Sequence, residues 1–155
     1  MDSRQMLIAF PASPISPARV DPAFEEEALL AKSVGFDVGF ASLEIGDLRL
    51  KVPEGHGAAL YRGWMLLVGD YAKLHEALAR RGYQLVNDAN AYQHCHHLPE
   101  WYDAIGGSKV TPRSIWFPGT STSFDMASVV DRVRAEYGKV PVILKDYVKS
   151  RKHES

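Results

Sequence analysis

The chain has 155 residues, of which 46% are hydrophobic, and this composition supports a folded core and excludes a disordered chain. The formal net charge is −1, so no overall electrostatic field favours nucleic acid or a membrane surface. Cys95 is the single cysteine and no apolar run approaches the roughly 20 residues of a membrane span, so we expect a soluble cytoplasmic protein without disulfides or a membrane partner.

The first part of the chain predicts a β-α-β arrangement. Residues 5–10 form an apolar run typical of a buried strand, and the prolines within 11–17 exclude a helix or a central strand there. Asp21 suits the N-cap of a helix over 22–34, and a second apolar strand is expected over 37–43. The loop at 11–17 follows the carboxyl end of a strand, where open α/β folds bind ligands, but it contains no glycine-rich dinucleotide fingerprint. This alternation predicts an α/β fold with a mainly parallel sheet.

The middle of the chain continues the alternation and places one arginine in an apolar run. We expect a more exposed strand over 48–52, a helix over 70–81 with Asp70 as its cap, and a short strand over 84–86. Arg62 interrupts the apolar run that precedes this helix. Because burying an unpaired guanidinium is costly, Arg62 is expected to meet either a carboxylate of this chain or an anionic ligand.

Two groups of potential metal ligands are expected not to bind a metal. Glu25, Glu26 and Glu27 are consecutive, and neighbouring residues of a helix point about 100° apart, so the three cannot hold one ion. The second group is the histidine cluster, which comprises His94, His96 and His97. Of these, His94 and His97 have the spacing of helical zinc ligands, but no second pair with suitable spacing accompanies them. We therefore predict no metal site in these residues.

The C-terminal third predicts two helices and two strands. A first helix is expected over 99–105, and a second over 123–137, where apolar residues recur with the helical period. A strand is expected over 111–118. The β-branched run at 140–144 predicts a buried strand that ends at Lys145.

Lys145 is followed by a basic cluster of Lys149, Arg151, Lys152 and His153. A buried strand that ends at a lysine and continues into a basic loop suits a phosphate group, because the strand fixes the lysine and the loop adds charge and backbone N–H groups. Alternatively, these residues form a solvated basic tail, which is the usual role of a run of like charges. The residues alone leave both interpretations open.

The C-terminal segment VPVILKDYVKSRKHE resembles a segment of ATP-grasp proteins, in which a strand carries a lysine that contacts the nucleotide phosphates and a flexible loop follows. The resemblance is to the amidoligase-like clade named for two arginines and a lysine. The segments YRGWML, HLPEWY and TPRS also resemble parts of that clade, so the resemblance runs from about Met6 to the end of the chain.

The resemblance implies a division into two parts and a set of nucleotide-binding residues. Residues 1–108 would form a Rossmann-like, preATP-grasp α/β domain with a parallel sheet layer, and residues 109–155 would form part of the N-terminal lobe of an ATP-grasp fold. Lys145 would contact the phosphates of ATP. The other residues implied in nucleotide binding are Arg62 and Arg151, as the two arginines, and Lys149, Ser150 and Lys152 in the loop that covers the phosphates.

The C-terminal lobe of the ATP-grasp fold has no counterpart in these 155 residues. The resemblance implies an ATP-dependent carboxylate–amine ligase that works through an acyl phosphate, with ATP as cofactor and small-molecule carboxylate and amine substrates. Mg²⁺ would bind only when the missing lobe is supplied, so this chain alone is expected to bind ATP weakly and to have little or no activity. The alternative is a non-catalytic binding module whose basic C-terminal tail contacts a phosphate ligand, nucleic acid or a protein partner.

Overall fold

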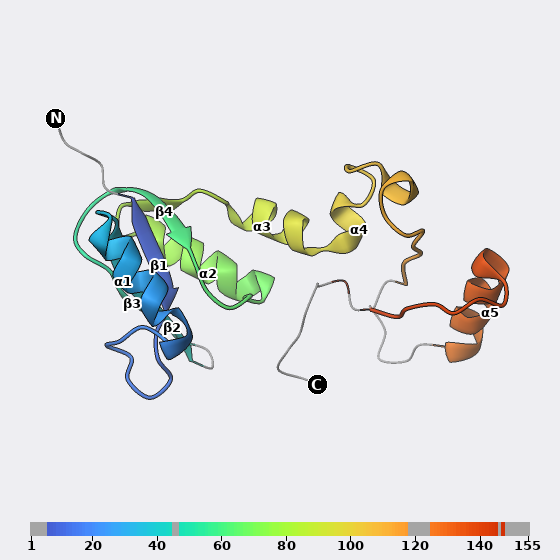
Figure 1. Cartoon of the computed structure of the whole chain (residues 1–155), viewed down its shortest axis with the longest axis horizontal. Helices are drawn as coiled ribbons and strands as arrows, with labels where there is room; N and C mark the ends of the chain where they lie inside the picture. The colour runs from blue at the N-terminus through green and yellow to red at the C-terminus, as the bar shows by residue number, and fades with distance from the viewer. Residues whose placement is uncertain (1–5, 45–46, 118–124, 146, 148–155) are drawn as a thin grey trace. The chain divides into compact units, whose positions relative to one another are not determined.

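The computed structural model describes residues 6–44, 47–117, 125–145 and 147. The chain separates into two compact units, Met1–Gln93 (unit 1) and His94–Ser155 (unit 2). Figure 1 shows that unit 1 contains the β-sheet, whereas the described residues of unit 2 form helices and irregular segments.

Unit 1 is built on a mixed five-stranded sheet with the strand order β3-β2-β1-β4-β5. Strands β2, β1, β4 and β5 are parallel to one another, whereas β3 pairs antiparallel with β2. The strands are β1 (Leu7–Pro11), β2 (Asp37–Glu44), β3 (Asp47–Lys51), β4 (Gly57–Tyr61) and β5 (Tyr83–Leu85). These bounds confirm the four strands predicted in this unit to within two residues, and the fold is α/β as predicted.

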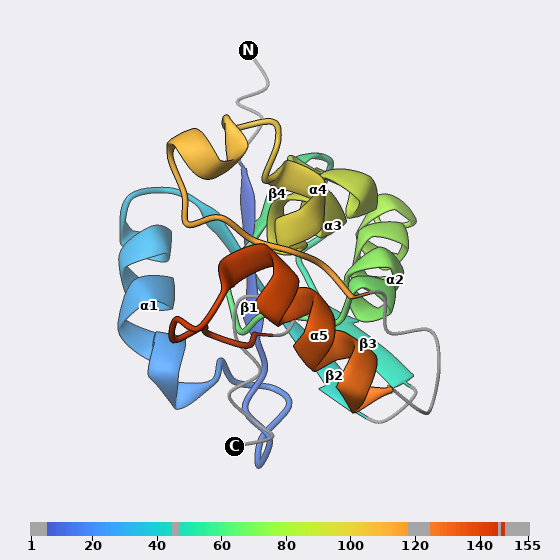
Figure 2. The ribbon, with the colours of Figure 1, turned by 90° about the vertical axis from the view of Figure 1, so that its right-hand side faces the viewer.

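Helices cover both faces of this sheet. The 3₁₀ helix η1 (Pro22–Phe24) leads into α1 (Glu25–Ser33), α2 spans Val68–Ala79, and α3 spans Ala89–His96. Figure 1 and Figure 2 show α1 and α2 on opposite faces of the sheet. Together η1 and α1 confirm the helix predicted over 22–34, and α2 confirms the helix predicted over 70–81 with a shift of two residues.

Each face of the sheet has its own apolar core. The core on the side of α2 includes five residues that are at most 1% exposed, namely Leu7, Ala59, Leu74, Leu78 and Tyr83. The core on the side of α1 consists of Phe10, Phe24, Ala28 and Ala31. Because successive side chains of a strand point to opposite faces, β1 can contribute to both cores.

The two predicted helix caps have different outcomes. The Asp21 carboxylate accepts a hydrogen bond from the Ala23 amide at 2.9 Å, which confirms its predicted role as N-cap. The prediction that Asp70 caps α2 is wrong, because the helix begins earlier and Leu67 is its N-cap residue. The backbone carbonyl of Leu67 accepts from the amides of Asp70 and Tyr71, and so starts the helix without a side-chain cap. Asp70 lies in the first turn, where a carboxylate interacts favourably with the helix dipole.

The described part of unit 2 is helical with irregular connections. Its elements are α4 (Leu98–Trp101), the 3₁₀ helix η2 (Gly107–Lys109) and α5 (Met126–Tyr137). Helix α5 confirms the helix predicted over 123–137. Across the residues that the structure describes, no helix combines the length and apolar character needed to cross a bilayer.

The two strands predicted in unit 2 do not form. Residues 111–117 and 140–144 are irregular, and residue 118 lies outside the described residues. The side chains of Ile143 and Leu144 are each 84% exposed, whereas a buried strand was expected there. A β-branched apolar run favours an extended conformation, but a strand also needs a hydrogen-bonded neighbour, and the described residues of unit 2 provide none.

Candidate functional site

The carboxyl ends of β1 and β4 form the part of unit 1 where a ligand would be expected. β1 lies between β2 and β4, and the chain leaves β1 through α1 but leaves β4 through α2 on the other face. The two connections therefore diverge at this edge, which is a topological switch point of an open α/β sheet. Arg62 is at this edge, because its amide donates to the Ala9 carbonyl directly after the end of β4.

Arg62 is paired with a carboxylate of the same chain. Its Nε and Nη2 atoms donate to Glu27 Oε2 and Oε1 at 2.7 and 2.8 Å, and its guanidinium lies 5.6 Å from the centre of the Phe24 ring. The side chains of Arg62 and Glu27 are 56% and 46% exposed, so the pair is at the surface. Of the two partners expected for Arg62, the structure contains the internal carboxylate. Whether Arg62 also contacts a nucleotide stays a prediction.

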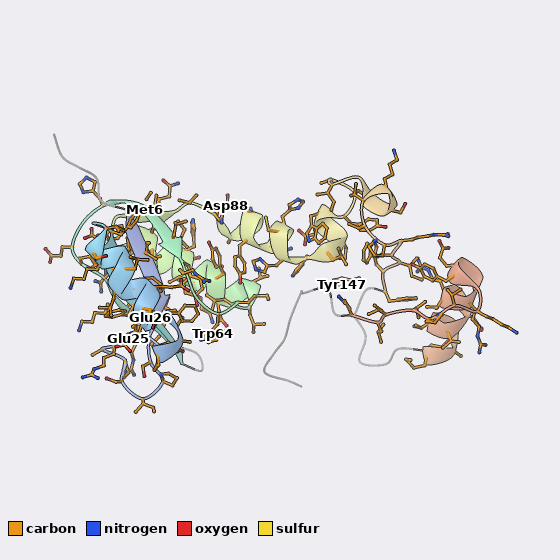
Figure 3. All side chains as sticks on the ribbon, in the orientation of Figure 1. Met6, Glu25, Glu26, Trp64, Asp88 and Tyr147 are labelled. Carbon is orange, nitrogen blue, oxygen red and sulfur yellow. The ribbon has the colours of Figure 1, made fainter. Side chains whose placement is uncertain are left out.

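Trp64 contacts the start of the first helix at this edge of the sheet. Trp64 Nε1 donates to Asp21 Oδ2 at 3.0 Å, and the Trp64 ring packs edge-on against Phe24 with centres 5.1 Å apart. Figure 3 shows Trp64 near the first residues of α1. A Cβ atom at Gly63 would lie 2.6 Å from Pro11 Cγ, so the backbone after β4 packs directly on the end of β1. These contacts join the loops after β1 and β4 and are sufficient to explain why Arg62 and Trp64 are held there.

We predict that Arg62→Ala lowers the free energy of unfolding by about 1 kcal/mol, because it removes a bidentate ion pair and a cation–π contact. The matched control is Arg80→Ala, since Arg80 forms a looser pair with Glu76, at 3.8 Å, on exposed side chains. We expect that control to change stability by less than about 0.5 kcal/mol. Urea denaturation of both variants measures the difference. Equal losses would mean that the contacts of Arg62 add nothing beyond an ordinary surface pair.

Two histidines of the cluster lie near the carboxylate of Glu100. His97 Nδ1 lies 3.0 Å from Glu100 Oε1, and His94 Nδ1 lies 3.9 Å from Glu100 Oε2. Within the described ranges, no group of three or more His, Cys, Asp or Glu side chains is arranged to hold a metal ion. The contact between His97 and Glu100 joins the N-cap residue of α4 to its first turn, which is a structural role.

Lys145 is exposed and follows an irregular segment instead of a strand. Two residues later, the carbonyl of Tyr147 accepts a hydrogen bond from the amide of Leu98, the first residue of α4, at 3.1 Å. Figure 3 labels Tyr147, which this bond places beside the start of α4. The other residues predicted in the phosphate loop, Lys149, Ser150, Arg151 and Lys152, lie outside the described residues.

The segment HLPEWY, at residues 97–102, contacts two other segments of unit 2. Besides the Leu98–Tyr147 bond, Tyr102 donates its hydroxyl hydrogen to the Pro112 carbonyl at 3.1 Å and packs edge-on against Trp116, with ring centres 5.3 Å apart. The three segments that carry the resemblance in unit 2 are therefore in contact. Sequence reasoning did not find the Leu98–Tyr147 bond. No side-chain type signals this bond, because it joins two backbone groups.

Helix α5 is attached to the segment that precedes it. Tyr137 donates its hydroxyl hydrogen to the Arg113 carbonyl at 3.0 Å, and the Arg113 guanidinium pairs with Glu136 and lies 5.7 Å from the centre of the Tyr137 ring. Both anchors are in the last turn of α5, immediately before the chain continues to Lys145. The start of the Lys145 segment is therefore held by Arg113, and its end is held by Leu98.

No protein-family model matches the chain, and comparisons with curated proteins and with solved structures gave no significant match. The functional assignment of this chain therefore rests on its own residues. Lys145 and the contacts that hold it in unit 2 are the strongest candidate, because Arg62 is already paired within unit 1.

Proposed function

We propose that the chain is the nucleotide-binding portion of an ATP-grasp type, ATP-dependent carboxylate–amine ligase, in which Lys145 contacts the phosphates of ATP. The observation that carries the proposal is the contact of HLPEWY with both of the other segments of unit 2 that resemble such enzymes. Unit 1 is compatible with it, since it has an α/β fold in which the strands β2-β1-β4-β5 are parallel. The substrates in this proposal are a small carboxylate, which is activated as an acyl phosphate, and an amine.

The chemistry assigned to Lys145 is charge neutralisation. The side chain of Lys145 is exposed, so its ammonium group is free to approach an anion from solvent. Mg²⁺, which such reactions use, prefers carboxylate oxygens as ligands, and the described residues contain no group suited to hold it. No step is therefore assigned to a metal on this chain, and we expect weak ATP binding with little or no catalysis.

The test compares two lysines. Titration of ATP by calorimetry at low salt should give a dissociation constant on the order of 0.1–1 mM or weaker, because the charge contacts are present without an adenine pocket. Lys145→Ala should weaken binding several-fold, whereas Lys32→Ala should leave it unchanged. Lys32 is the matched control because it is an exposed lysine on α1. Binding should also weaken at high salt, which screens exposed charges.

Equal effects of the two substitutions would remove Lys145 from the proposal. They would favour the second candidate, a non-catalytic module that binds phosphate-bearing partners through distributed positive charge. The pairing of Arg62 with Glu27 favours this alternative, because one of the two arginines assigned to the nucleotide is held within the chain. The module should bind pyrophosphate, ATP and a short oligonucleotide according to their charge, whereas the ligase portion should prefer ATP.

A further inference from the structure

The Leu98–Tyr147 hydrogen bond uses an amide that the helix itself cannot satisfy. Leu98 is the first residue of α4, and amides in the first turn of a helix have no intrahelical acceptor. The next residue, Pro99, has no amide hydrogen, and the amide of Glu100 donates to the His97 carbonyl at 2.9 Å. The Leu98 amide is therefore the donor at the start of α4 that is available to another segment, and the Tyr147 carbonyl accepts from it.

The described residues of the segment that receives this bond are irregular, and most are exposed. Residues 139–145 have no regular secondary structure, and the side chains of Val142, Ile143 and Leu144 are exposed. The bond from Leu98 to Tyr147 is a backbone hydrogen bond that joins this segment to α4. Removing it should therefore increase the motion of the backbone at Lys145 and Tyr147.

The position of Tyr147 restricts the position of Lys145. The two residues are two positions apart, so the backbone of Lys145 lies within about 7 Å of the anchored residue. The side chain of Lys145 is exposed and available to a ligand. A fixed backbone lowers the entropy cost of bringing that side chain to an anion, which is the usual benefit of preorganisation.

We infer that the Leu98 amide is a positioning group for Lys145: by holding the Tyr147 carbonyl, α4 presents the Lys145 ammonium to a phosphate ligand. The identity of that ligand as ATP rests on the proposed function, but the ordering of Lys145 by Leu98 does not. The segment HLPEWY thus acquires a role, which is to anchor the lysine without touching the ligand.

One substitution removes the donor and keeps the helix. Leu98→Pro deletes the amide hydrogen, and proline is well tolerated in the first turn of a helix. The preceding residue, His97, has φ −88° and ψ 106°, which is the extended conformation favoured before proline. The matched control is Leu98→Ala, which removes the same side chain but keeps the amide. A difference between the two variants therefore reports the hydrogen bond.

The first measurement needs no ligand. NMR relaxation should show increased fast motion of the Lys145 and Tyr147 amides in Leu98→Pro but not in Leu98→Ala, and the Leu98 amide of the folded, unmodified chain should exchange more slowly than it does in the unfolded chain. Equal motion of Lys145 in the two variants, or unprotected exchange at Leu98, would overturn the inference. This result is independent of whether ATP binds.

The second measurement is a double-mutant cycle on ATP binding. Leu98→Pro should weaken ATP binding about two- to tenfold relative to Leu98→Ala, which corresponds to the loss of one hydrogen bond. Adding Lys145→Ala to Leu98→Pro should have less effect than Lys145→Ala alone, because the lysine is no longer positioned. Additive effects would overturn the inference while leaving the proposed function intact. If the unmodified chain does not bind ATP, the proposed function fails, and the motion of Lys145 still decides the inference.

Discussion

Leu74→Ala should lower the free energy of unfolding by about 2–5 kcal/mol, which is the range for truncating a fully buried leucine. Leu74 is 0% exposed and belongs to the core between α2 and the sheet, together with Leu7 and Tyr83. The substitution removes apolar contacts and leaves a cavity. The neighbouring residues of the sheet cannot move to fill it without breaking the hydrogen bonds between the strands. Unit 1 should therefore unfold at a clearly lower urea concentration.

The matched control is Leu29→Ala. Leu29 is also a leucine on a helix, but it is 64% exposed on α1, so the same change in helix propensity accompanies a small change in burial. We expect the control to change stability by less than about 0.5 kcal/mol. Urea denaturation followed by circular dichroism compares the two variants. Similar decreases in the free energy of unfolding for Leu29→Ala and Leu74→Ala would contradict the placement of the core on the α2 face.

Most elements of unit 1 were predictable because each is indicated by local chemistry, whereas β4 and α3 were not predicted. Asp21 and Pro22 mark the start of the first helix, and the apolar runs at β1 and β2 have the length and composition of buried strands. The spacing of Leu74 and Leu78 indicates the buried face of α2. These signals lie within a few residues of the element that they describe. They also suffice for the α/β class, since strands that alternate with helices favour a parallel sheet.

Features that depend on distant partners could not be predicted in the same way. The antiparallel pairing of β3 with β2 and the position of β4 beside β1 are set by the packed sheet, and no short segment encodes them. The run at 140–144 was predicted to form a strand that the structure does not contain. Its composition indicates a buried strand, but in the structure it is irregular and exposed, because a strand exists only when a neighbour accepts and donates its hydrogen bonds.

In the candidate site, too, the partners that are distant in the sequence could not be predicted. Arg62 has the anionic partner that was expected, but the reason given for it was wrong, because the side chain is 56% exposed and an exposed guanidinium needs no partner. The identity of that partner, Glu27, was not predictable, because the two residues are 35 positions apart. The Leu98–Tyr147 bond joins two backbone groups, and a backbone hydrogen bond leaves no trace in the types of its side chains.

Alkaline pH should destabilise unit 1, because several of its tyrosines are buried in their neutral form. Burial raises the pKa of Tyr71 to about 12, and the nearby Tyr92 and Asp88 add to the increase. The pKa values of Tyr61, Tyr83 and Tyr92 are also raised, in each case mainly by burial. The Tyr71 and Tyr92 rings stack with centres 3.8 Å apart, so ionisation of either would place a charge beside the other.

The sign of the effect follows from the order in which the two states lose protons. A tyrosine in the unfolded chain ionises near pH 10, whereas Tyr71 in the folded chain keeps its proton until about pH 12. Between these values the unfolded state binds fewer protons, so the free energy of unfolding falls as pH rises. Each such tyrosine contributes a slope of up to about 1.4 kcal/mol per pH unit. We therefore expect unit 1 to lose several kcal/mol of stability between pH 10 and 12, values set by the unfolded and folded pKa of Tyr71.

Tyr71→Phe separates this contribution from the titration of lysines, which both proteins share. At neutral pH the variant should be less stable by about 1 kcal/mol, because the Tyr71 hydroxyl donates to the Asn87 carbonyl at 2.8 Å. Above pH 10 phenylalanine has no proton to lose, so the difference should shrink and then reverse as pH approaches 12, the folded pKa of Tyr71. Urea denaturation at neutral pH and at steps above pH 10 measures the difference. A constant difference would mean that Tyr71 ionises equally in both states and that its ring is accessible to water in the folded chain.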